Sequence, residues 1–142
     1  MFVVHPAPSG DPSPEAPTMK LDLRRSTELE LSELARPGLH IENDAEGEGF
    51  GALQMFAASM ALCTASVLHH YAHHVLQVGV EGLRLTVAWD YADKPSRVGR
   101  LEMLVSWPEL PEDRREAARR AAETCTIHNT LERPPEVVTR VA

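Results

Sequence analysis

The sequence predicts an α+β protein in which helices pack on antiparallel β-structure. Three observations support this class. Apolar and polar residues alternate with a period of two in four short segments, residues 52–77 contain neither glycine nor proline, and a charged, alanine-rich stretch follows the last alternating segment. Because the alternating segments come in two adjacent pairs, they favour antiparallel hairpins with the helices laid against them.

The composition limits both the size and the partners of the protein. Its 142 residues, 43% of them apolar, are enough for one sizeable core and too few for two. The formal net charge of −7 repels a phosphate backbone, so we expect no nucleic-acid partner. Residues 52–68 form the longest apolar stretch, which four polar residues interrupt, so we expect no membrane span. No secretion signal is evident at the N-terminus, and a cytoplasmic location is expected.

Residues 1–18 and residues 19–142 differ in character. Five of the 11 prolines fall within the first 17 residues, among serine, glycine and aspartate. Such a composition buries too little apolar surface to offset the entropy of ordering. We therefore expect a flexible tail over residues 1–18 and a single domain over residues 19–142.

The first half of the domain predicts a hairpin and one long helix. Leucines alternate with polar residues on both sides of a tip at residues 25–27, which indicates a β-hairpin. A short apolar step at residues 39–41 and an acidic, glycine-rich loop at residues 43–49 follow. Residues 52–77 are rich in alanine, leucine and methionine, and they predict a central helix that stops near Gly79.

The second half predicts a second strand pair, a second helix and a closing strand. Residues 83–89 and 101–107 alternate across a turn at residues 93–96. The helix is expected to start at Pro111, whose acidic neighbours suit a first turn, and to end near Cys125. Three valines after the last prolines indicate a closing strand; they are Val137, Val138 and Val141.

The two cysteines are the first candidates for chemistry. Cys63 lies within the predicted central helix among small and apolar neighbours, and Cys125 lies near the predicted end of the second helix. Taken singly, each is typical of a small buried core residue. Two cysteines are too few for a disulfide scaffold, so a pairing between them would point to redox chemistry.

The sequence segments around the two cysteines help to choose between buried core residues and redox chemistry. Residues 53–63, which lead into Cys63, and residues 121–128, which surround Cys125, resemble the corresponding segments of the OsmC/Ohr family of thiol-dependent hydroperoxide reductases. The order of elements agrees with that family from about residue 19 to residue 141. The resemblance implies antiparallel β-sheets packed around a long central helix, in an intertwined homodimer whose active sites form at the subunit interface.

The same resemblance implies an enzyme, a cysteine-based peroxidase of the oxidative-stress response. Cys63 would be the peroxidatic cysteine and Cys125 the resolving cysteine, with an organic hydroperoxide as substrate. A small or protein dithiol would reset the disulfide, and no cofactor is required. The chemistry agrees, because a thiolate that attacks a peroxide oxygen expels the alkoxide and becomes a sulfenic acid, which a second thiol condenses into a disulfide.

A lowered thiol pKa at Cys63 requires a cation from another segment, because this residue lies well inside its helix. Cys125, at a helix C-terminus, is expected at the negative end of the dipole, which favours its protonated form. In the family that the chain resembles, this cation is an arginine held by a glutamate. At the position expected for the glutamate, this chain has Leu53 followed by Gln54. Arg25 at the hairpin tip is the first candidate cation.

Arg24 and Arg36 are further candidates, and Gln54 could orient the cation through its side-chain carbonyl. All three arginines are equally typical of solvated surface charges. Because the glutamate is missing, a second hypothesis remains open: a protein of the same fold that binds a ligand or a metal without catalysis.

Two further groups of residues bear on substrate and metal. Apolar side chains around Cys63 predict a substrate pocket that favours an alkyl hydroperoxide; they are Phe56, Met60 and Val67. His69 with His73, and likewise His70 with His74, lie four residues apart on one helical face, a spacing suited to a metal. A third ligand would have to come from His128 or Cys125. Two hypotheses account for these histidines. They form either a polar helix end, which is the stronger hypothesis, or a metal site.

Overall fold

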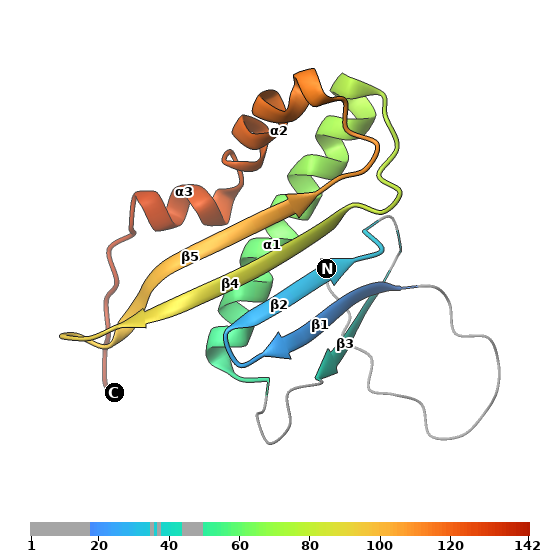
Figure 1. The fold of residues 1–142 in the computed structure, drawn as a ribbon. Helices are drawn as coiled ribbons and strands as arrows, with labels where there is room; N and C mark the ends of the chain where they lie inside the picture. Colours follow the sequence, from blue (N-terminus) through green and yellow to red (C-terminus); the bar gives the residue numbers. More distant parts are fainter. Residues whose placement is uncertain (1–17, 35, 37, 44–49) are drawn as a thin grey trace.

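The computed structural model describes residues 18–34, 36, 38–43 and 50–142, so the expected tail lies outside the described residues except for Thr18. Figure 1 shows the elements. In chain order they are β1 (Met19–Arg25), β2 (Glu28–Ser32), β3 (Leu39–Asn43), α1 (Ala52–Tyr71), the π-helical turn η1 (Ala72–Leu76), β4 (Arg84–Ala92), β5 (Arg97–Ser106), the 3-10 turn η2 (Glu112–Arg114), α2 (Arg115–Ala122) and α3 (Thr126–Glu132).

The described strands form one five-stranded sheet in the order β3-β1-β2-β4-β5. Both expected hairpins are present, β1 with β2 and β4 with β5, and β2 joins them by antiparallel pairing with β4. The short apolar segment at residues 39–41 forms part of one more strand, β3, which pairs parallel to β1. The α+β class is therefore confirmed, with a mixed edge where only antiparallel pairing was expected.

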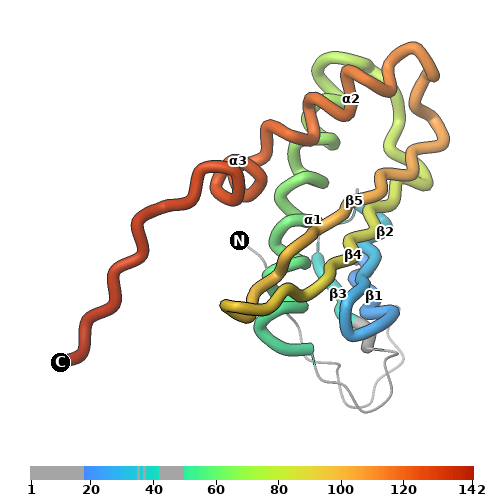
Figure 2. Tube along the Cα trace, turned by 60° about the vertical axis from the view of Figure 1, so that its left-hand side comes forward, coloured from blue at the N-terminus to red at the C-terminus, as the bar shows by residue number. Residues whose placement is uncertain are grey.

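Helix α1 packs on one face of this sheet, as Figures 1 and 2 show from two directions. Alternation along the strands turns a row of apolar side chains toward the helix. The fully buried ones are Leu21, Leu23, Leu29, Leu31, Leu85 and Val87. Small helix residues such as Ala57 and Ala61 face them and allow a close approach. Each buried leucine or valine contributes about 1.5–3 kcal/mol, so this layer carries much of the folding free energy.

The side of α1 that points away from the sheet is covered less completely. Together, α1 and η1 span 25 residues, long and apolar enough by length and composition to cross a membrane, although the sequence indicated a shorter apolar run. The core helix of a water-exposed domain meets the same criterion. Here only 39% of the most apolar 18-residue window is buried, and Met55 is 62% exposed. The chain therefore leaves part of an apolar helix uncovered within its described residues.

The end of the central helix differs in detail from the expectation. The helix widens into the π turn η1 and stops at Gln77, which adopts left-handed backbone angles (φ 53°, ψ 42°). Gly79 instead accepts a hydrogen bond at its carbonyl from Trp107 Nε1, 2.9 Å away. A left-handed residue ends a helix whatever its side chain, and glycine is only the least costly choice.

The expected closing strand is wrong. Residues 134–142 contain neither helix nor strand, and Val137, Val138 and Val141 are 83%, 63% and 95% exposed. Figure 2 shows this segment leading away from α3 and from the rest of the molecule. Valines favour a strand only where a neighbouring strand supplies hydrogen bonds, and none does so for this segment among the described residues.

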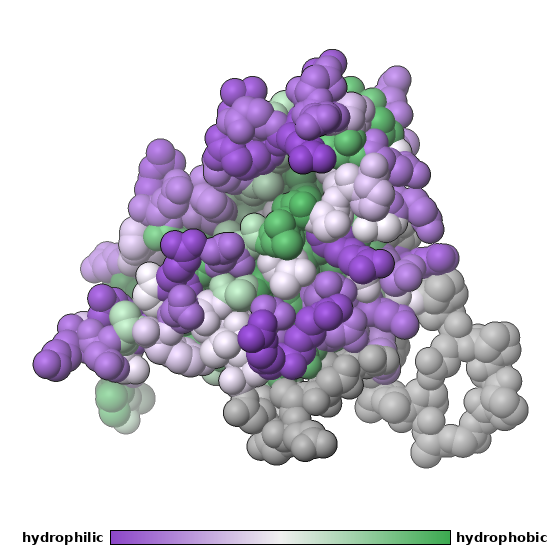
Figure 3. Space-filling model, in the orientation of Figure 1, coloured by the Kyte–Doolittle hydropathy of each residue, from purple (hydrophilic) through white to green (hydrophobic). Residues whose placement is uncertain are grey.

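The sheet face that points away from α1 is mainly hydrophilic (Figure 3). On that face the register pairs Thr86 with Leu104 and Ala88 with Glu102. Leu104 is the exception, since it is 65% exposed. An apolar area near β5 and α2 interrupts the polar surface in Figure 3. Leu104 also lines a cavity between α1, β5 and α2.

Candidate thiol site

Cys125 lies between two short helices rather than at the end of one. Helix α2 ends at Ala122, and Cys125 takes extended backbone angles (φ −63°, ψ 146°) as the N-cap of α3. Its Sγ accepts a hydrogen bond from the backbone N–H of His128 at 3.2 Å. The expected position at the negative end of a helix is therefore wrong: a new helix starts here, and its first amides point at the sulfur.

A second donor reaches the same sulfur from the central helix. Thr64 Oγ1 of α1 donates to Cys125 Sγ at 3.6 Å. Thr64 is 1% exposed and Cys125 is fully buried. A buried hydroxyl needs a partner, and a sulfur is a weak but sufficient acceptor. The fold thus brings Cys125 against the helix position next to Cys63.

Cys63 is half-buried, and both cysteines are free thiols. Successive residues of an α-helix point about 100° apart around its axis, so Cys63 and Thr64 face different directions. Cys63 is accordingly the more accessible thiol, whereas Cys125 is enclosed between α1 and α3.

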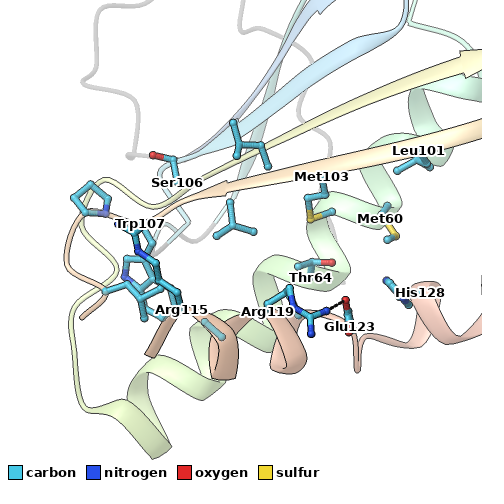
Figure 4. A pocket seen from close by; sticks show the side chains of 16 residues that line it. Met60, Thr64, Leu101, Met103, Ser106, Trp107, Arg115, Arg119, Glu123 and His128 are labelled. Carbon is cyan, nitrogen blue, oxygen red and sulfur yellow. Dashed lines mark hydrogen bonds and ion pairs between the residues drawn. The ribbon is translucent and has the colours of Figure 1, made fainter. Parts of the chain in front are cut away.

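A cavity of about 730 Å³ lies between α1, β5, α2 and the start of α3 (Figure 4), and neither Cys63 nor Cys125 is among the residues that line it. Met60 and Thr64 enter it from α1, Met103 from β5 and His128 from α3. Of the three residues expected to line a substrate pocket, Met60 lines this cavity, whereas Phe56 and Val67 do not. They lie on the same face of the helix as Met60, but about 6 Å before it and about 10 Å after it along the axis, so the cavity covers only the middle of that face.

Charged groups of α2 form one wall of this cavity. Arg119 Nε donates to Glu116 at 3.0 Å, and the same guanidinium pairs with Glu123, as the dashed line in Figure 4 shows. The hydrogen bond from Arg119 lowers the pKa of the Glu116 carboxyl. Both acids in turn raise the pKa of Arg119, first through the hydrogen bond with Glu116. This wall therefore keeps its charges paired.

The structure gives Gln54 a different partner from the expected arginine. Its Oε1 accepts from the N–H of Gly51 at 2.9 Å, and its Nε2 donates to the carbonyl of Ser26 at 2.8 Å. The expectation that Gln54 orients Arg25 is thus not met in this structure. Gln54 instead ties the first turn of α1 to the tip of the β1–β2 hairpin.

The three candidate arginines are paired with acids close to them in the sequence. Arg25 binds Glu28 at 2.9 Å and its side chain is 73% exposed. Arg24 and Arg36 bind Glu30 and Glu33, respectively. The Gln54 contact places the hairpin tip at the first turn of α1, nine residues from Cys63, which corresponds to about 13 Å along the axis. Within one chain, Arg25 is therefore poorly placed to activate Cys63.

The four histidines near the end of the central helix are exposed. The rings of His70 and His74 lie 4.2 Å apart between centroids, and His73 meets His74 at 4.8 Å. Partial desolvation lowers the pKa of His74, and the nearby His70 and His73 lower it further. No cluster of three or more His, Cys, Asp or Glu side chains suited to a metal occurs among the described residues.

Sequence reasoning missed the two residues that surround Cys125. Thr64 is one of few polar residues in the apolar helix, which is a signal for a buried hydroxyl with a specific partner. His128 follows Cys125 by three residues, the spacing at which an N-cap side chain meets a backbone amide. Both signals were present, but they required the helix start at Thr126 to be recognised.

The chain resembles known proteins in sequence and in structure. The model of the OsmC-like protein family matches residues 45–140. An OsmC-like hydroperoxide resistance protein from Jannaschia sp. CCS1 has a similar structure, with a TM-score of 0.53, 22% identity, and coverage of 81% of this chain and 83% of that chain. An osmotic stress induced and detoxification response protein from Psychrobacter arcticus 273-4 gives a TM-score of 0.54, 17% identity, and coverage of 80% and 87%. No curated protein matches the chain.

Proposed function

Because the chain belongs to the OsmC-like family, we propose that it reduces organic hydroperoxides through Cys63 and Cys125, as part of a defence against oxidative stress. The hydroperoxide resistance named for the Jannaschia protein supports this activity. The observation that carries the proposal is the contact between Thr64 Oγ1 and Cys125 Sγ. It brings the second thiol to the helix position adjacent to the first.

The proposed reaction has three balanced steps. The Cys63 thiolate attacks the terminal oxygen of the hydroperoxide, the O–O bond breaks, and the alkoxide leaves and takes up a proton as alcohol. The resulting sulfenic acid condenses with the Cys125 thiol to give a disulfide and water. A small or protein dithiol then reduces this disulfide by thiol–disulfide exchange and is itself oxidised.

Burial supports this division of roles. The half-buried Cys63 is accessible to a substrate, whereas the fully buried Cys125 is protected from direct oxidation. A disulfide needs the Cα atoms of its two cysteines within about 7 Å of each other. Cys125 contacts Thr64, whereas the side chain of Cys63 points in another direction around the helix axis. Resolution therefore requires a local shift of the short segment between α2 and α3, which carries Cys125.

We further propose that a second copy of the chain completes the site. The chain's own Arg25 is paired with Glu28 and lies near the far end of α1, so the cation that activates Cys63 comes from the partner. The uncovered side of α1 and the exposed C-terminal valines provide apolar surface for a homodimer. A reducing cytoplasm suits a cycle that consumes dithiols.

The surroundings favour an apolar substrate. Met60 lies three residues before Cys63 on α1, and together with Leu101 and Met103 it gives the cavity beside this part of the helix an apolar wall. Burial of an alkyl group contributes about 0.8 kcal/mol per methylene, which hydrogen peroxide cannot gain. We therefore expect faster turnover of cumene hydroperoxide than of hydrogen peroxide.

Thiol counting with a limiting amount of cumene hydroperoxide tests the proposal. The wild-type protein is expected to lose two thiols per chain and to regain them with dithiothreitol. Cys63→Ser is expected to lose none, and Cys125→Ser to accumulate a sulfenic acid that dimedone traps at Cys63. Ser66→Ala, an exposed position on the same helix, is the matched control and should behave as wild type. Equal thiol loss in Cys63→Ser and wild type would overturn the proposal.

The second candidate function is a non-catalytic binding protein of the same fold. It is favoured by Gln54, whose Oε1 accepts from Gly51 at the start of α1 and whose Nε2 donates to Ser26 at the hairpin tip, so that neither group binds an arginine. This alternative predicts no loss of thiols with any hydroperoxide while the protein stays folded and dimeric.

A further inference from the structure

We propose that His70 and His74 form a two-ligand site for a divalent transition-metal ion of the Cu²⁺, Ni²⁺ and Zn²⁺ class, at the end of the central helix. This site is separate from the proposed peroxidase chemistry. The sequence offered two such pairs, His69 with His73 and His70 with His74, and the structure brings the rings of the second pair together.

The ring geometry suits chelation. Two imidazole nitrogens that bind one metal at about 2.0–2.1 Å, with a right angle between the bonds, lie about 2.9 Å apart. The ring centroids of His70 and His74 are 4.2 Å apart, and the planes are tilted by 42°. Small rotations of these exposed side chains bring one nitrogen of each ring to the required separation. His73 meets His74 nearly edge-on at 4.8 Å, so it borders the pair.

The backbone explains why this pair is selected. His70 lies in the last turn of α1, whereas His74 lies within the π turn η1. A π turn holds more residues than an α turn, so it rotates the following side chains relative to the helix before it. Among the described residues, the ring contacts join His70, His73 and His74, and His69 takes part in none of them.

The position at the end of the helix favours a bound cation. The partial negative charge of a helix C-terminus attracts cations, and both histidines lie in the last turns before Gln77.

The number of ligands defines the class of metal. Because no cluster of three or more ligand side chains occurs in the described ranges, water would fill the remaining positions. Nitrogen and water ligands suit Cu²⁺ and Ni²⁺, and affinities in such sites rise from Ni²⁺ to Cu²⁺. The site lies seven residues beyond Cys63, or about 10 Å along the helix axis, so the thiol is not a ligand in the same chain.

Calorimetric titration of the reduced, full-length protein with NiCl₂ tests the proposal, since Ni²⁺ does not oxidise thiols. Saturable binding of one ion per chain is expected. His70→Ala and His74→Ala should each weaken it at least tenfold, whereas His69→Ala, the matched control from the same cluster, should change it less than twofold. Circular dichroism checks that each variant is folded, and His70→Asn provides a polar replacement.

Two outcomes overturn the inference: no saturable Ni²⁺ binding by the wild-type protein, or an equal loss in His69→Ala and His70→Ala. Cys63→Ser with Cys125→Ser should bind Ni²⁺ like wild type, and a loss there would assign the ion to the thiols. Peroxide turnover should be unchanged in His70→Ala. A negative result for the metal site would therefore leave the proposed peroxidase activity unaffected, and a negative result for the peroxidase would leave the metal site unaffected.

Discussion

Cys125 receives hydrogen bonds from two different helices, and neither donor is itself a charged group. The hydroxyl of Thr64 and the amide of His128 point at its sulfur. Donors aimed at the sulfur from two sides hold its side chain in one rotamer. The buried thiol is therefore held in place rather than merely packed.

Thr64→Val tests this contact at the level of one bond. The substitution removes the hydroxyl while roughly keeping the volume, and Cys125 keeps its hydrogen bond from His128. We expect a coupling of about 0.5–1.5 kcal/mol between Thr64 and Cys125 in the free energy of unfolding. Urea denaturation of Thr64→Val, Cys125→Ala and the double variant measures it. Strictly additive losses would show that the contact contributes nothing.

Gln54 makes a second prediction at the residue scale. Gln54→Leu removes the hydrogen bonds to Gly51 and Ser26, so we expect a loss of about 1–2 kcal/mol in unfolding free energy. Gln54→Glu keeps the acceptor for Gly51 but turns a carboxylate toward the Ser26 carbonyl. Its stability should fall between those of Gln54→Leu and wild type. Thermal unfolding gives the order, and a stability of Gln54→Leu equal to wild type contradicts this role.

At the scale of elements, short helices and turns rather than long ones define the candidate site. Helix α2 ends three residues before Cys125 and α3 starts directly after it. The sequence predicts α2 from its alanines and charges. The break between α2 and α3 depends on Cys125, whose sulfur accepts hydrogen bonds from the Thr64 hydroxyl and the His128 amide. Local propensity is weak in such short segments, and tertiary contacts decide their limits.

The ion pairs of α2 predict a pH dependence. Arg119 lowers the pKa of Glu116, so this carboxyl stabilises the folded state above its unfolded pKa and loses that contribution as the pH falls through its folded pKa. Arg119→Gln should raise the titration midpoint of Glu116 toward the ordinary value of about 4.3 for glutamate. Side-chain carbon NMR measures both midpoints. Arg120→Gln is the control on the same helix and should have the smaller effect, since it contributes less to the shift.

At the scale of the whole molecule, one chain leaves two apolar surfaces without cover in its described part. One is the side of α1 that faces away from the sheet, and the other is the C-terminal segment with Val137, Val138 and Val141. Exposed apolar surface of this extent marks an interaction site. Both surfaces are consistent with the proposed homodimer.

Removal of residues 136–142 is expected to weaken the homodimer. The valines of this segment can form a strand only with an edge outside their own chain, and β5 offers an outermost edge in the described sheet. Light scattering after size-exclusion chromatography should show a dimer for the full chain and a larger monomer fraction after truncation. Val138→Asp should shift the equilibrium in the same direction.

Thr130→Asp, an exposed position on α3, is the matched control for added charge. An unchanged dimer after truncation would show that the C-terminal segment takes no part in assembly. In that case the uncovered side of α1 would be the remaining candidate surface.

The sequence by itself determined the hairpins, the central helix and the α+β class, because alternation and helical periodicity record directly which side of each element is buried. It also indicated the family through the segments around Cys63 and Cys125. Only the tertiary structure decided that residues 39–43 join the sheet, that the C-terminal valines stay unpaired, and that Gln54 binds Ser26. These outcomes depend on which hydrogen-bonding partners come within reach, and partners distant in sequence leave no periodic signal along the chain.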